Sequence, residues 1–235
     1  MKISVCMATY NGQKYLKEQI DSILAQLGEN DELIISDDSS TDETVSIIKS
    51  YNNNKIKLFE KQTFFSPIFN FENAIKHASG DIIVLSDQDD VWSSSKLAEI
   101  RNDFKSDIDK VTLRMYNGVC IDSKGEIVQE DLFQYLNVRE GMWNNILKNR
   151  FIGCNVAFTR ELLRYVLPFP KSIPMHDMWL GLSTYIHGEV EFVDKKVFSY
   201  RLHANNYTGK KTSLWQKLKW RFQIVWNLIK RYIHE

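Results

Sequence analysis

Short apolar runs alternate with amphipathic segments through the first half of the chain. The apolar runs predict strands, because a short run rich in β-branched side chains fits a strand that is covered on both faces. These runs lie at 3–8, 32–36, 55–60 and 82–85. Apolar residues at helical spacing and a capping-box pattern predict helices at 15–26, 41–48 and 70–78. Repeated strand–helix units predict a parallel sheet with helices on both faces.

Polar residues follow three of these predicted strands, at 9–11, 37–38 and 87–90. In such sheets ligands bind beyond the carboxyl ends of the strands, so we expect the three segments to converge on one crevice. No Gly-x-Gly-x-x-Gly follows the first strand, which argues against a dinucleotide site, and no Gly-Lys-Ser/Thr phosphate loop is present. The chain also lacks the basic glycine-rich N-terminal loop of a sugar nucleotidyltransferase, and it is far longer than a receiver domain.

Three carboxylates, those of Asp87, Asp89 and Asp90, follow the fourth predicted strand. Crowded carboxylates repel one another unless a cation neutralises them. Oxygen ligands favour Mg²⁺ or Mn²⁺ over zinc, and Mg²⁺ usually shares such sites with substrate phosphates, so the stretch predicts a metal–diphosphate site. Two alternatives stay open at this point. One is an acidic turn that caps the next helix; the other is a phosphatase-like Asp-x-Asp-x-Thr motif with Asp87 as nucleophile, although Val91 replaces the hydroxyl.

The composition describes an ordinary globular protein. Of the 235 residues 43% are hydrophobic, enough for one substantial core and a smaller lobe, and the zero net charge does not favour a nucleic-acid partner. Cys6, Cys120 and Cys154 show no paired metal spacing, so we expect small buried hydrophobes in a reducing compartment. The N-terminal apolar run is too short for a signal peptide, and no run reaches the ~18 apolar residues of a membrane span. We expect a cytoplasmic protein, soluble or peripheral.

Three sequence blocks resemble, in order and spacing, the signature blocks of family-2 glycosyltransferases, which are inverting, metal-dependent enzymes of the GT-A fold. The blocks are Val-Cys-Met-Ala-Thr-Tyr-Asn at 5–11, Ile-Ser-Asp-Asp-Ser-Ser-Thr-Asp at 35–42 and Ser-Asp-Gln-Asp-Asp-Val-Trp at 86–92. The third block is most similar to bacterial rhamnosyltransferase-like members. The resemblance implies a Rossmann-like, mainly parallel α/β sheet flanked by helices. Its parts would be a nucleotide-sugar-binding half at 1–112, an acceptor-binding half of the same domain at 113–208, and a basic amphipathic helix at 209–235.

The resemblance assigns the nucleotide pocket to the ends of the first two strands. Residues matching Thr9, Tyr10 and Asn11 line this pocket, and Asp38 matches a carboxylate that accepts a hydrogen bond from a ring N–H of the base. Uracil and thymine carry such an N–H, which implies a UDP- or dTDP-linked donor. The alternative for the aspartate pair at 37–38 is that it caps the following helix.

The acidic block supplies the remaining donor and metal contacts in the same comparison. Asp87 and Gln88 are assigned to the donor, and Asp89 and Asp90 to a Mg²⁺ or Mn²⁺ ion that bridges its diphosphate. The ion would stabilise charge on the leaving nucleoside diphosphate. Trp92 follows this block and suits either the sugar site or the core.

The second half contains the predicted catalytic base. The block Pro-Met-His-Asp-Met-Trp-Leu at 174–180 resembles the family block whose aspartate accepts the proton of the acceptor hydroxyl, which assigns that role to Asp177. The alternative is an aspartate that caps a helix beginning at Met178, and His176 is expected to orient its neighbours. Segment 151–158 resembles a strand beneath the donor sugar, where Gly153 either allows a close approach of the sugar or is an ordinary strand glycine.

A third block in this half, Tyr-Arg-Leu-His-Ala-Asn-Asn at 200–206, follows an apolar strand at 193–199. It resembles a Tyr-Arg-x-His-x-x-Asn block of rhamnosyltransferase-like relatives. Arg201 is expected to pair with phosphate oxygens, and His203 to ligate the cation or bond the diphosphate.

The C-terminal segment is basic and amphipathic. From Gly209 onward it carries seven Lys or Arg against one acid, so this segment has a charge of about +6 and the rest of the chain about −6. Two apolar stripes lie on opposite sides of the predicted helix: Trp215, Leu218, Phe222, Val225, Trp226, Ile229 and Ile233, and then Trp220, Ile224 and Leu228. The pattern favours a helix at 213–235 on an anionic membrane surface. Packing on the domain or on a protein partner is the alternative.

Together these features predict a metal-dependent inverting glycosyltransferase. It would move a sugar, with rhamnose as a candidate, from a nucleoside diphosphate donor to a glycan or lipid-linked acceptor in bacterial surface polysaccharide synthesis. We expect it at the inner face of the plasma membrane. The alternatives are a non-catalytic sugar-nucleotide-binding module and a phosphohydrolase that uses Asp87.

Overall fold

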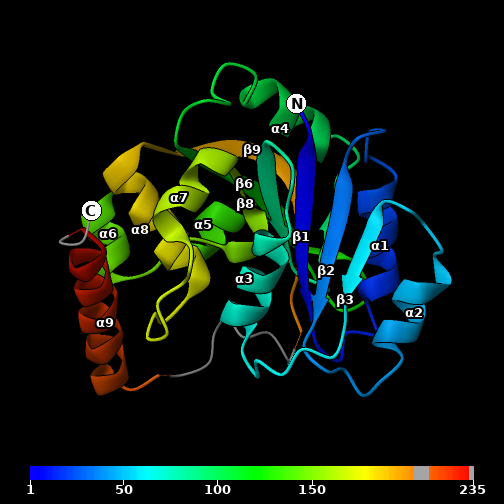
Figure 1. Ribbon diagram of the computed structural model, residues 1–235, viewed down its shortest axis with the longest axis horizontal. Helices are drawn as coiled ribbons and strands as arrows, with labels where there is room; N and C mark the ends of the chain where they lie inside the picture. The colour runs from blue at the N-terminus through cyan, green and yellow to red at the C-terminus, as the bar shows by residue number, and fades with distance from the viewer. Residues whose placement is uncertain (204–211, 233–235) are drawn as a thin grey trace.

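The strands predicted in the first half form the parallel part of one sheet (Figure 1). The computed structural model describes residues 1–203 and 212–232. In it, β1 (Ile3–Thr9) lies between β2 (Glu32–Asp37) and β4 (Ile82–Ser86), and β3 (Ile56–Phe59) forms the edge beyond β2. All of these neighbours are parallel. The carboxyl ends of β1, β2 and β4 therefore meet at one edge of the sheet.

The rest of the sheet is mixed. β8 (Val156–Thr159) is antiparallel to both β4 and β6 (Thr112–Ile121), and β9 (Glu189–Arg201) is parallel to β6. The short β5 (Val91–Trp92) and β7 (Ile127–Gln129) pair with β9 and β6. Because β5 directly follows the acidic loop after β4, its pairing with β9 brings the end of β9 next to that loop.

Helices flank the sheet, as predicted. α1 (Leu16–Leu24) contacts α2 (Thr44–Ser50), while α3 (Pro67–Lys76) packs against β1, β2 and α8 (His176–His187). Further helices are α4 (Lys96–Asp103), α5 (Leu132–Leu136), α6 (Met142–Leu147), α7 (Leu163–Val166) and α9 (Leu214–Tyr232), with 3₁₀ turns at Gly153–Asn155 and Arg160–Leu162. In Figure 1, α6, α7, α8 and α9 lie together at one side of the molecule, and α1 and α2 lie at the other.

The centre of the sheet is fully covered. All five residues of β4 are buried, as expected of an apolar run that has helices on both faces. The three cysteines, Cys6, Cys120 and Cys154, are free thiols and are also buried, as predicted.

Several predicted boundaries differ from the structure. The helix predicted to begin at Met178 begins at His176, because Met175 is still extended (φ −154°, ψ 140°). Segment 151–158 is a strand only from Val156 onward, and Gly153 lies in a 3₁₀ turn. Part of the predicted C-terminal blocks lies outside the described residues: Asn205, Asn206, Lys210, Lys211 and Ile233.

Candidate active site

The loops after β1, β2 and β4 are tied together by side-chain hydrogen bonds. Gln88 donates from Nε2 to the carbonyl oxygen of Tyr10 and accepts the Tyr10 backbone N–H at Oε1, both at 3.0 Å. Asn11, in the left-handed region at φ 48°, accepts the backbone N–H of Thr41 at 2.8 Å through Oδ1. The three predicted strand ends therefore lie together along one rim.

Asp37 holds the turn after β2. Its Oδ2 accepts hydrogen bonds from the hydroxyls of Thr9 at 2.8 Å and Ser40 at 2.6 Å. Its Oδ1 accepts a hydrogen bond from the backbone N–H of Ser40 at 2.9 Å. The helix-cap alternative is wrong for this aspartate, because the first turn of α2 is held by Asp42, whose Oδ1 accepts the backbone N–H of Thr44 at 3.0 Å.

Asp38 lies beside the segment that leads into α3. Its carboxylate oxygens accept the backbone N–H groups of Phe64 at 2.7 Å and Ser66 at 3.0 Å, so it does not cap α2 either. Each carboxylate oxygen has two lone pairs, so Asp38 keeps acceptor capacity for a ligand N–H. The side chain of Tyr10 is 56% exposed at the rim, where its ring is accessible to a ligand.

Two carboxylates and a thiol gather directly beyond β4. Oxygen atoms of Asp87 and Asp90 and the Sγ of Cys154 lie within 4.8 Å of one another. Asp90 is buried; its Oδ1 accepts the backbone N–H of Arg201 at 3.0 Å, while its Oδ2 has no hydrogen-bond partner among the described residues. Leaving a buried acceptor unpaired is unfavourable. This oxygen is therefore suited to bind a cation.

The electrostatics of the cluster support the same interpretation. Burial raises the pKa of Asp87 well above its ordinary value, and the charges of Asp89 and Asp90 raise it further. Burial also raises the pKa of Asp90 to about 7, with the charge of Asp89 as the second cause. A divalent cation among these oxygens would remove the repulsion, so the residues fit Mg²⁺ or Mn²⁺.

Asp89 connects this loop to the end of β9. Its Oδ2 lies 2.8 Å from Nε2 of His203, and its carbonyl oxygen accepts Nε of Arg201 at 2.8 Å. The structure thus brings Asp89, Arg201 and His203 together, as the resemblance implies. The two carboxylates whose oxygen atoms lie near each other are those of Asp87 and Asp90. The predicted ligand set was Asp89, Asp90 and His203, and it stays a prediction.

Two residues at the start of α1 belong to the site but were not predicted. The Oε2 atom of Glu18 accepts a hydrogen bond from Nη2 of Arg201 at 2.6 Å. The ring of Tyr15 lies 4.6 Å from the guanidinium carbon and stacks on His203 at 5.3 Å between centroids. Spacing of three residues places Tyr15 and Glu18 on one helix face. No sequence pattern links that face to residue 201.

Asp177 lies in the first turn of α8, beside Gly153, the residue before Cys154. Its Oδ1 accepts the backbone N–H of Met178 at 2.7 Å and the Nδ2 amide of Asn149 at 3.0 Å. Burial raises the pKa of Asp177 to about 6, although these hydrogen bonds act in the opposite direction. The charge of Asp177 also contributes to the raised pKa of Asp87, so the two carboxylates act on each other.

His176 fills the space beside Gly153. A Cβ at position 153 would stand 2.6 Å from Nε2 of His176, so the close approach at this glycine is made by the imidazole. The ring stacks on Phe71 with centroids 4.3 Å apart, and burial lowers the pKa of His176 to about 4. A neutral, packed imidazole suits the predicted role of orienting its neighbours.

A buried lysine lies behind the acids and was also missed. Lys96 has no exposed surface; its Nζ donates to Oδ1 of Asn155 at 3.2 Å and lies 4.2 Å from the ring of Trp92. Burial lowers the pKa of Lys96 to about 8, while neighbouring Cys154 and Asp90 raise it. Trp92 is 4% exposed and belongs to the core, which answers the question left open by its sequence position.

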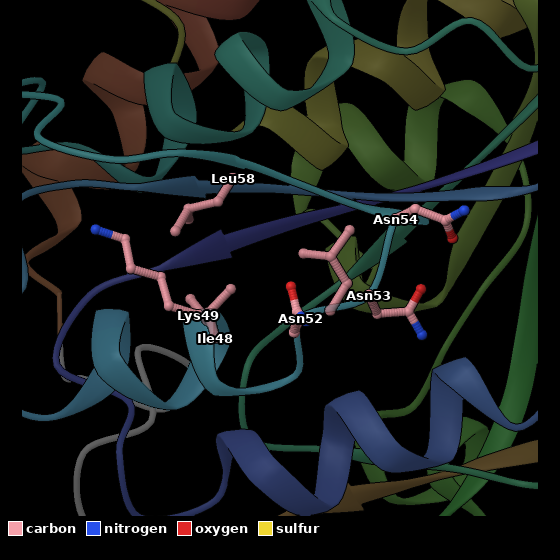
Figure 2. Close-up of a pocket in the computed structure, with 7 residues that line it drawn as sticks. Ile48, Lys49, Asn52, Asn53, Asn54 and Leu58 are labelled. Carbon is pink, nitrogen blue, oxygen red and sulfur yellow. The ribbon is translucent and has the colours of Figure 1, made fainter.

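A separate hollow lies at the β3 edge of the sheet (Figure 2). Its volume is about 330 Å³, and side chains of α2, β3 and the loop between them line it: Ile48, Lys49, Asn52, Asn53, Asn54, Ile56 and Leu58. Because β2 and β1 separate β3 from β4 in the sheet, this hollow is separate from the acidic cluster at the end of β4.

Comparison with known proteins identifies the family. Residues 4–167 match the family described as Glycosyl transferase family 2. The matched region includes the strand ends of β1, β2 and β4, whereas Asp177, Arg201 and His203 lie beyond it.

Two curated relatives cover most of the chain. An uncharacterised glycosyltransferase of Nostoc sp. is 30% identical over 88% of this chain and 67% of its own length. The UDP-Glc:alpha-D-GlcNAc-diphosphoundecaprenol beta-1,3-glucosyltransferase of Escherichia coli is 27% identical over 97% of this chain and 86% of its own length.

Two solved structures share the fold. TarS 1–349 of S. aureus in complex with UDP-GlcNAc has a TM-score of 0.70 and 18% identity, covering 100% of this chain and 73% of that one. Glucosyl-3-phosphoglycerate synthase of Mycobacterium tuberculosis, in complex with Mn²⁺, UDP and phosphoglyceric acid, has a TM-score of 0.60 and 20% identity, covering 98% and 78%.

These likenesses confirm the expected GT-A type fold. The match to the family confirms the predicted enzyme class, a glycosyltransferase, and sets aside both the phosphohydrolase and the non-catalytic module. The rhamnosyltransferase-like subset stays a prediction. The family match over residues 4–167 and the shared α/β fold lead to one conclusion: the chain belongs to glycosyl transferase family 2.

Proposed function

We propose that the chain transfers a sugar from a pyrimidine nucleoside diphosphate to a lipid-linked glycan, with inversion at the anomeric carbon and with a divalent cation. The observation that carries this proposal is that two kinds of carboxylate lie on neighbouring segments of the fold. Ligand atoms of Asp87, Asp90 and Cys154 lie within 4.8 Å of one another at the end of β4, and Asp177, in the first turn of α8, lies beside Gly153, the residue before Cys154. A single displacement needs both a site for the leaving diphosphate and a base for the acceptor hydroxyl.

The rim after β1 and β2 is the part that we assign to the nucleotide. Thr9, Tyr10, Asn11 and Asp38 lie there, with the exposed Tyr10 ring as a wall and the Asp38 carboxylate as an acceptor for a uracil or thymine N–H. UDP or a UDP-sugar is bound in the S. aureus and M. tuberculosis structures with this fold. A UDP-linked hexose is therefore our first candidate donor, and dTDP-rhamnose is the second.

We assign the cation to Asp89, Asp90 and His203, with Asp87 and Gln88 beside the donor. The unpartnered Oδ2 of Asp90 and the mutual repulsion of the acids support this assignment. When bound, such an ion supplies positive charge that stabilises the departing diphosphate. We also assign Arg201 to the phosphate oxygens of the donor; its guanidinium is buried and is held at the same loop by the Asp89 carbonyl oxygen and by Glu18.

Asp177 is the residue that we assign as general base. With a pKa of about 6 it is ionised at neutral pH, yet it is a stronger base than an ordinary aspartate. The amide of Asn149 orients its Oδ1. As the acceptor oxygen attacks the anomeric carbon, its proton passes to Asp177, and the nucleoside diphosphate leaves from the opposite face of the sugar.

A lipid-linked acceptor is supported by the C-terminal helix and by one relative. The E. coli protein is named for an acceptor, GlcNAc-diphosphoundecaprenol, that carries a lipid. The outward side of α9 is apolar, which suits a peripheral contact through 213–235 with the inner face of the plasma membrane. Surface polysaccharide assembly in bacteria is the setting that we propose.

The test is a transfer assay on the full chain with Mn²⁺, a sugar linked to a prenyl diphosphate, and either UDP-glucose, UDP-GlcNAc or dTDP-rhamnose. We expect transfer from at least one of these donors. Asp177→Asn should lower the rate by about 10²- to 10⁴-fold, the usual contribution of a general base, while calorimetry still shows nucleotide binding.

The matched control is Asp109→Asn, which neutralises an exposed carboxylate between α4 and β6 and should leave the rate unchanged. NMR of the product reports the anomeric configuration. Retention of configuration, or full activity of Asp177→Asn, would contradict the proposal.

A further inference from the structure

We propose that α6 and α9 together form one docking surface for an anionic lipid bilayer. This surface, the α6–α9 face, consists of eight exposed apolar residues: Trp143, Leu147, Leu214, Trp215, Leu218, Phe222, Trp226 and Ile229. It extends the proposed membrane contact to a second helix and to a class of lipid. It depends on the proposed function only for the idea that the acceptor is held in that bilayer.

One side of α9 is buried against the domain, and the opposite side is exposed. Ile224 and Leu228 are 0% and 5% exposed against the domain, and Asn227 donates from Nδ2 to the hydroxyl of Ser172 at 3.0 Å. Near the end of the helix, Arg231 donates to the carbonyl oxygen of Leu167 at 3.2 Å. The opposite side, at positions 214, 215, 218, 222, 226 and 229, is 46–82% exposed. α9 is therefore held in place, with its apolar stripe directed outward.

α6 continues this stripe. Trp143 and Leu147 are 77% and 62% exposed, and α6 contacts α9. Arg221 joins the two helices, because its Nε donates to the carbonyl oxygen of Leu147 at 2.8 Å. In Figure 1 both helices lie at the outer edge of the molecule, away from the β3 edge. Exposed apolar side chains gathered on two adjoining helices are typical of an interaction site.

Basic residues border the apolar patch and favour an anionic partner. At 3.6 residues per turn, Lys219 and Lys230 flank one side of the stripe, whereas Lys217 lies on the same side of α9 as Ile224 and Leu228, at its exposed N-terminal end. Burial lowers the pKa of Lys148, at the end of α6, and the positive charges of Arg150 and Lys217 lower it further. Within residues 1–203 and 212–232, none of these lysines forms an ion pair with an acid. The border is therefore positive and suits an anionic surface.

A bilayer explains this combination better than a second copy of the chain. A symmetric dimer through the α6–α9 face would bring two positive borders together, which is unfavourable. On a lipid surface the lysines would lie near anionic headgroups, which attract them. The side chains of Trp143, Trp215 and Trp226 would lie at the boundary between headgroups and acyl chains. In the described parts of the chain, no helix is long and apolar enough to pass through the bilayer, so the contact would be peripheral.

Flotation of the full chain with vesicles tests the docking surface without any need for catalysis. We expect binding to phosphatidylcholine vesicles that contain phosphatidylglycerol, and much weaker binding to phosphatidylcholine alone. The pair Lys219→Glu and Lys230→Glu should reduce binding by about tenfold or more, because each lysine near an anionic surface contributes about fivefold. Trp143→Ser alone should reduce it about tenfold, because its ring lies at the membrane interface.

The matched control is Ile127→Ser, which removes an apolar side chain that is 55% exposed on β7, outside the patch. It should bind vesicles like the wild type. Circular dichroism and transfer to a water-soluble acceptor analogue establish that the variants are folded, and this transfer should be unchanged in Trp143→Ser.

Three results would overturn the docking proposal: no flotation of the wild type, equal binding to neutral vesicles, or unchanged binding of Trp143→Ser. A dimer in solution that Trp143→Ser or Phe222→Ser dissociates would also overturn it, in favour of a protein interface. Failure of the proposed function would show differently, as vesicle binding without sugar transfer to any acceptor.

Discussion

The backbone of Gly153 lies directly against the imidazole of His176. A Cβ at position 153 would stand 2.6 Å from Nε2 of that ring and 3.6 Å from the Cβ of Asp177. The glycine thus belongs to the wall that holds the proposed base, and its missing side chain is what lets the first turn of α8 lie against the 3₁₀ turn before β8.

Gly153→Ala should therefore damage catalysis more than stability. The added methyl displaces His176 and, with it, the adjacent Asp177, and a shift of about 1 Å at a reacting group costs about 100-fold in rate. We expect kcat to fall by that order and the melting temperature to fall by a few degrees, because overpacking beside a buried ring costs about 1–3 kcal/mol.

The double variant Gly153→Ala with His176→Ala removes the clash and provides the control. It should recover part of the lost rate, so that the two substitutions are not additive. A double variant that is slower than either single variant would contradict this account.

The rate should depend on pH through Asp177. The proposed base acts when ionised, and burial raises its pKa to about 6, so kcat/KM should fall about tenfold per pH unit below that value. Asn149→Leu removes a hydrogen bond that favours the ionised carboxylate, so the acidic limb of the pH–rate profile should move to higher pH. A limb that stays in place after this substitution would exclude Asp177 as the titrating group.

The metal-free protein should become less stable as the pH rises. The pKa of Asp90 is about 7 in the folded chain and ordinary in the unfolded chain, so its contribution is fully present at low pH and is lost as the pH passes through about 7. Melting temperatures between about pH 5 and pH 8 measure this effect. Mn²⁺ should raise the melting temperature most at the upper end, and Asp90→Asn should flatten the dependence. Equal effects of Mn²⁺ at both ends would contradict the prediction.

Lys96 should lower the affinity of the acidic cluster for a divalent cation. It is fully buried, and Asp90 is among the charges that act on it, so Lys96→Met removes an internal positive charge from behind the cluster. We expect Mn²⁺ to bind about tenfold more tightly and the metal-free protein to melt at a lower temperature. Trp92→Phe, which alters packing beside Lys96 without changing charge, is the control, and calorimetric titration with Mn²⁺ is the measurement. Equal Mn²⁺ affinity in wild type and Lys96→Met would refute this role.

Local patterns were sufficient to predict the first half of the fold. β1, β2 and β4 lie where short apolar runs predict them, because a strand covered on both faces leaves a continuous apolar signal. Parallel strands then place their carboxyl ends at one edge, so the acidic loop after Ser86 was expected beside Thr9 and Asp37 from topology alone.

The rest of the site depends on contacts between residues far apart in the chain. Glu18 pairs with Arg201, and Cys154 joins Asp87 and Asp90, although neither residue carries a motif of its own. The pairing of β5 with β9 brings Arg201 to the acidic loop, and the pairing of β4 with β8 brings Cys154 there. A two-residue strand such as β5 has too little periodicity to be predicted.

The sequence by itself determined the alternation of strands and helices, the acidic strand end and the two stripes of α9, because these are properties of neighbouring residues. Only the tertiary structure decided which stripe is covered: Ile224 and Leu228 pack on the domain, and Trp215 and Phe222 face outward. Helical periodicity sorts side chains by face, but what covers a face depends on elements elsewhere in the chain. The same reason explains why Gly153 contacts His176, since the space beside a glycine is filled by whatever the fold brings there.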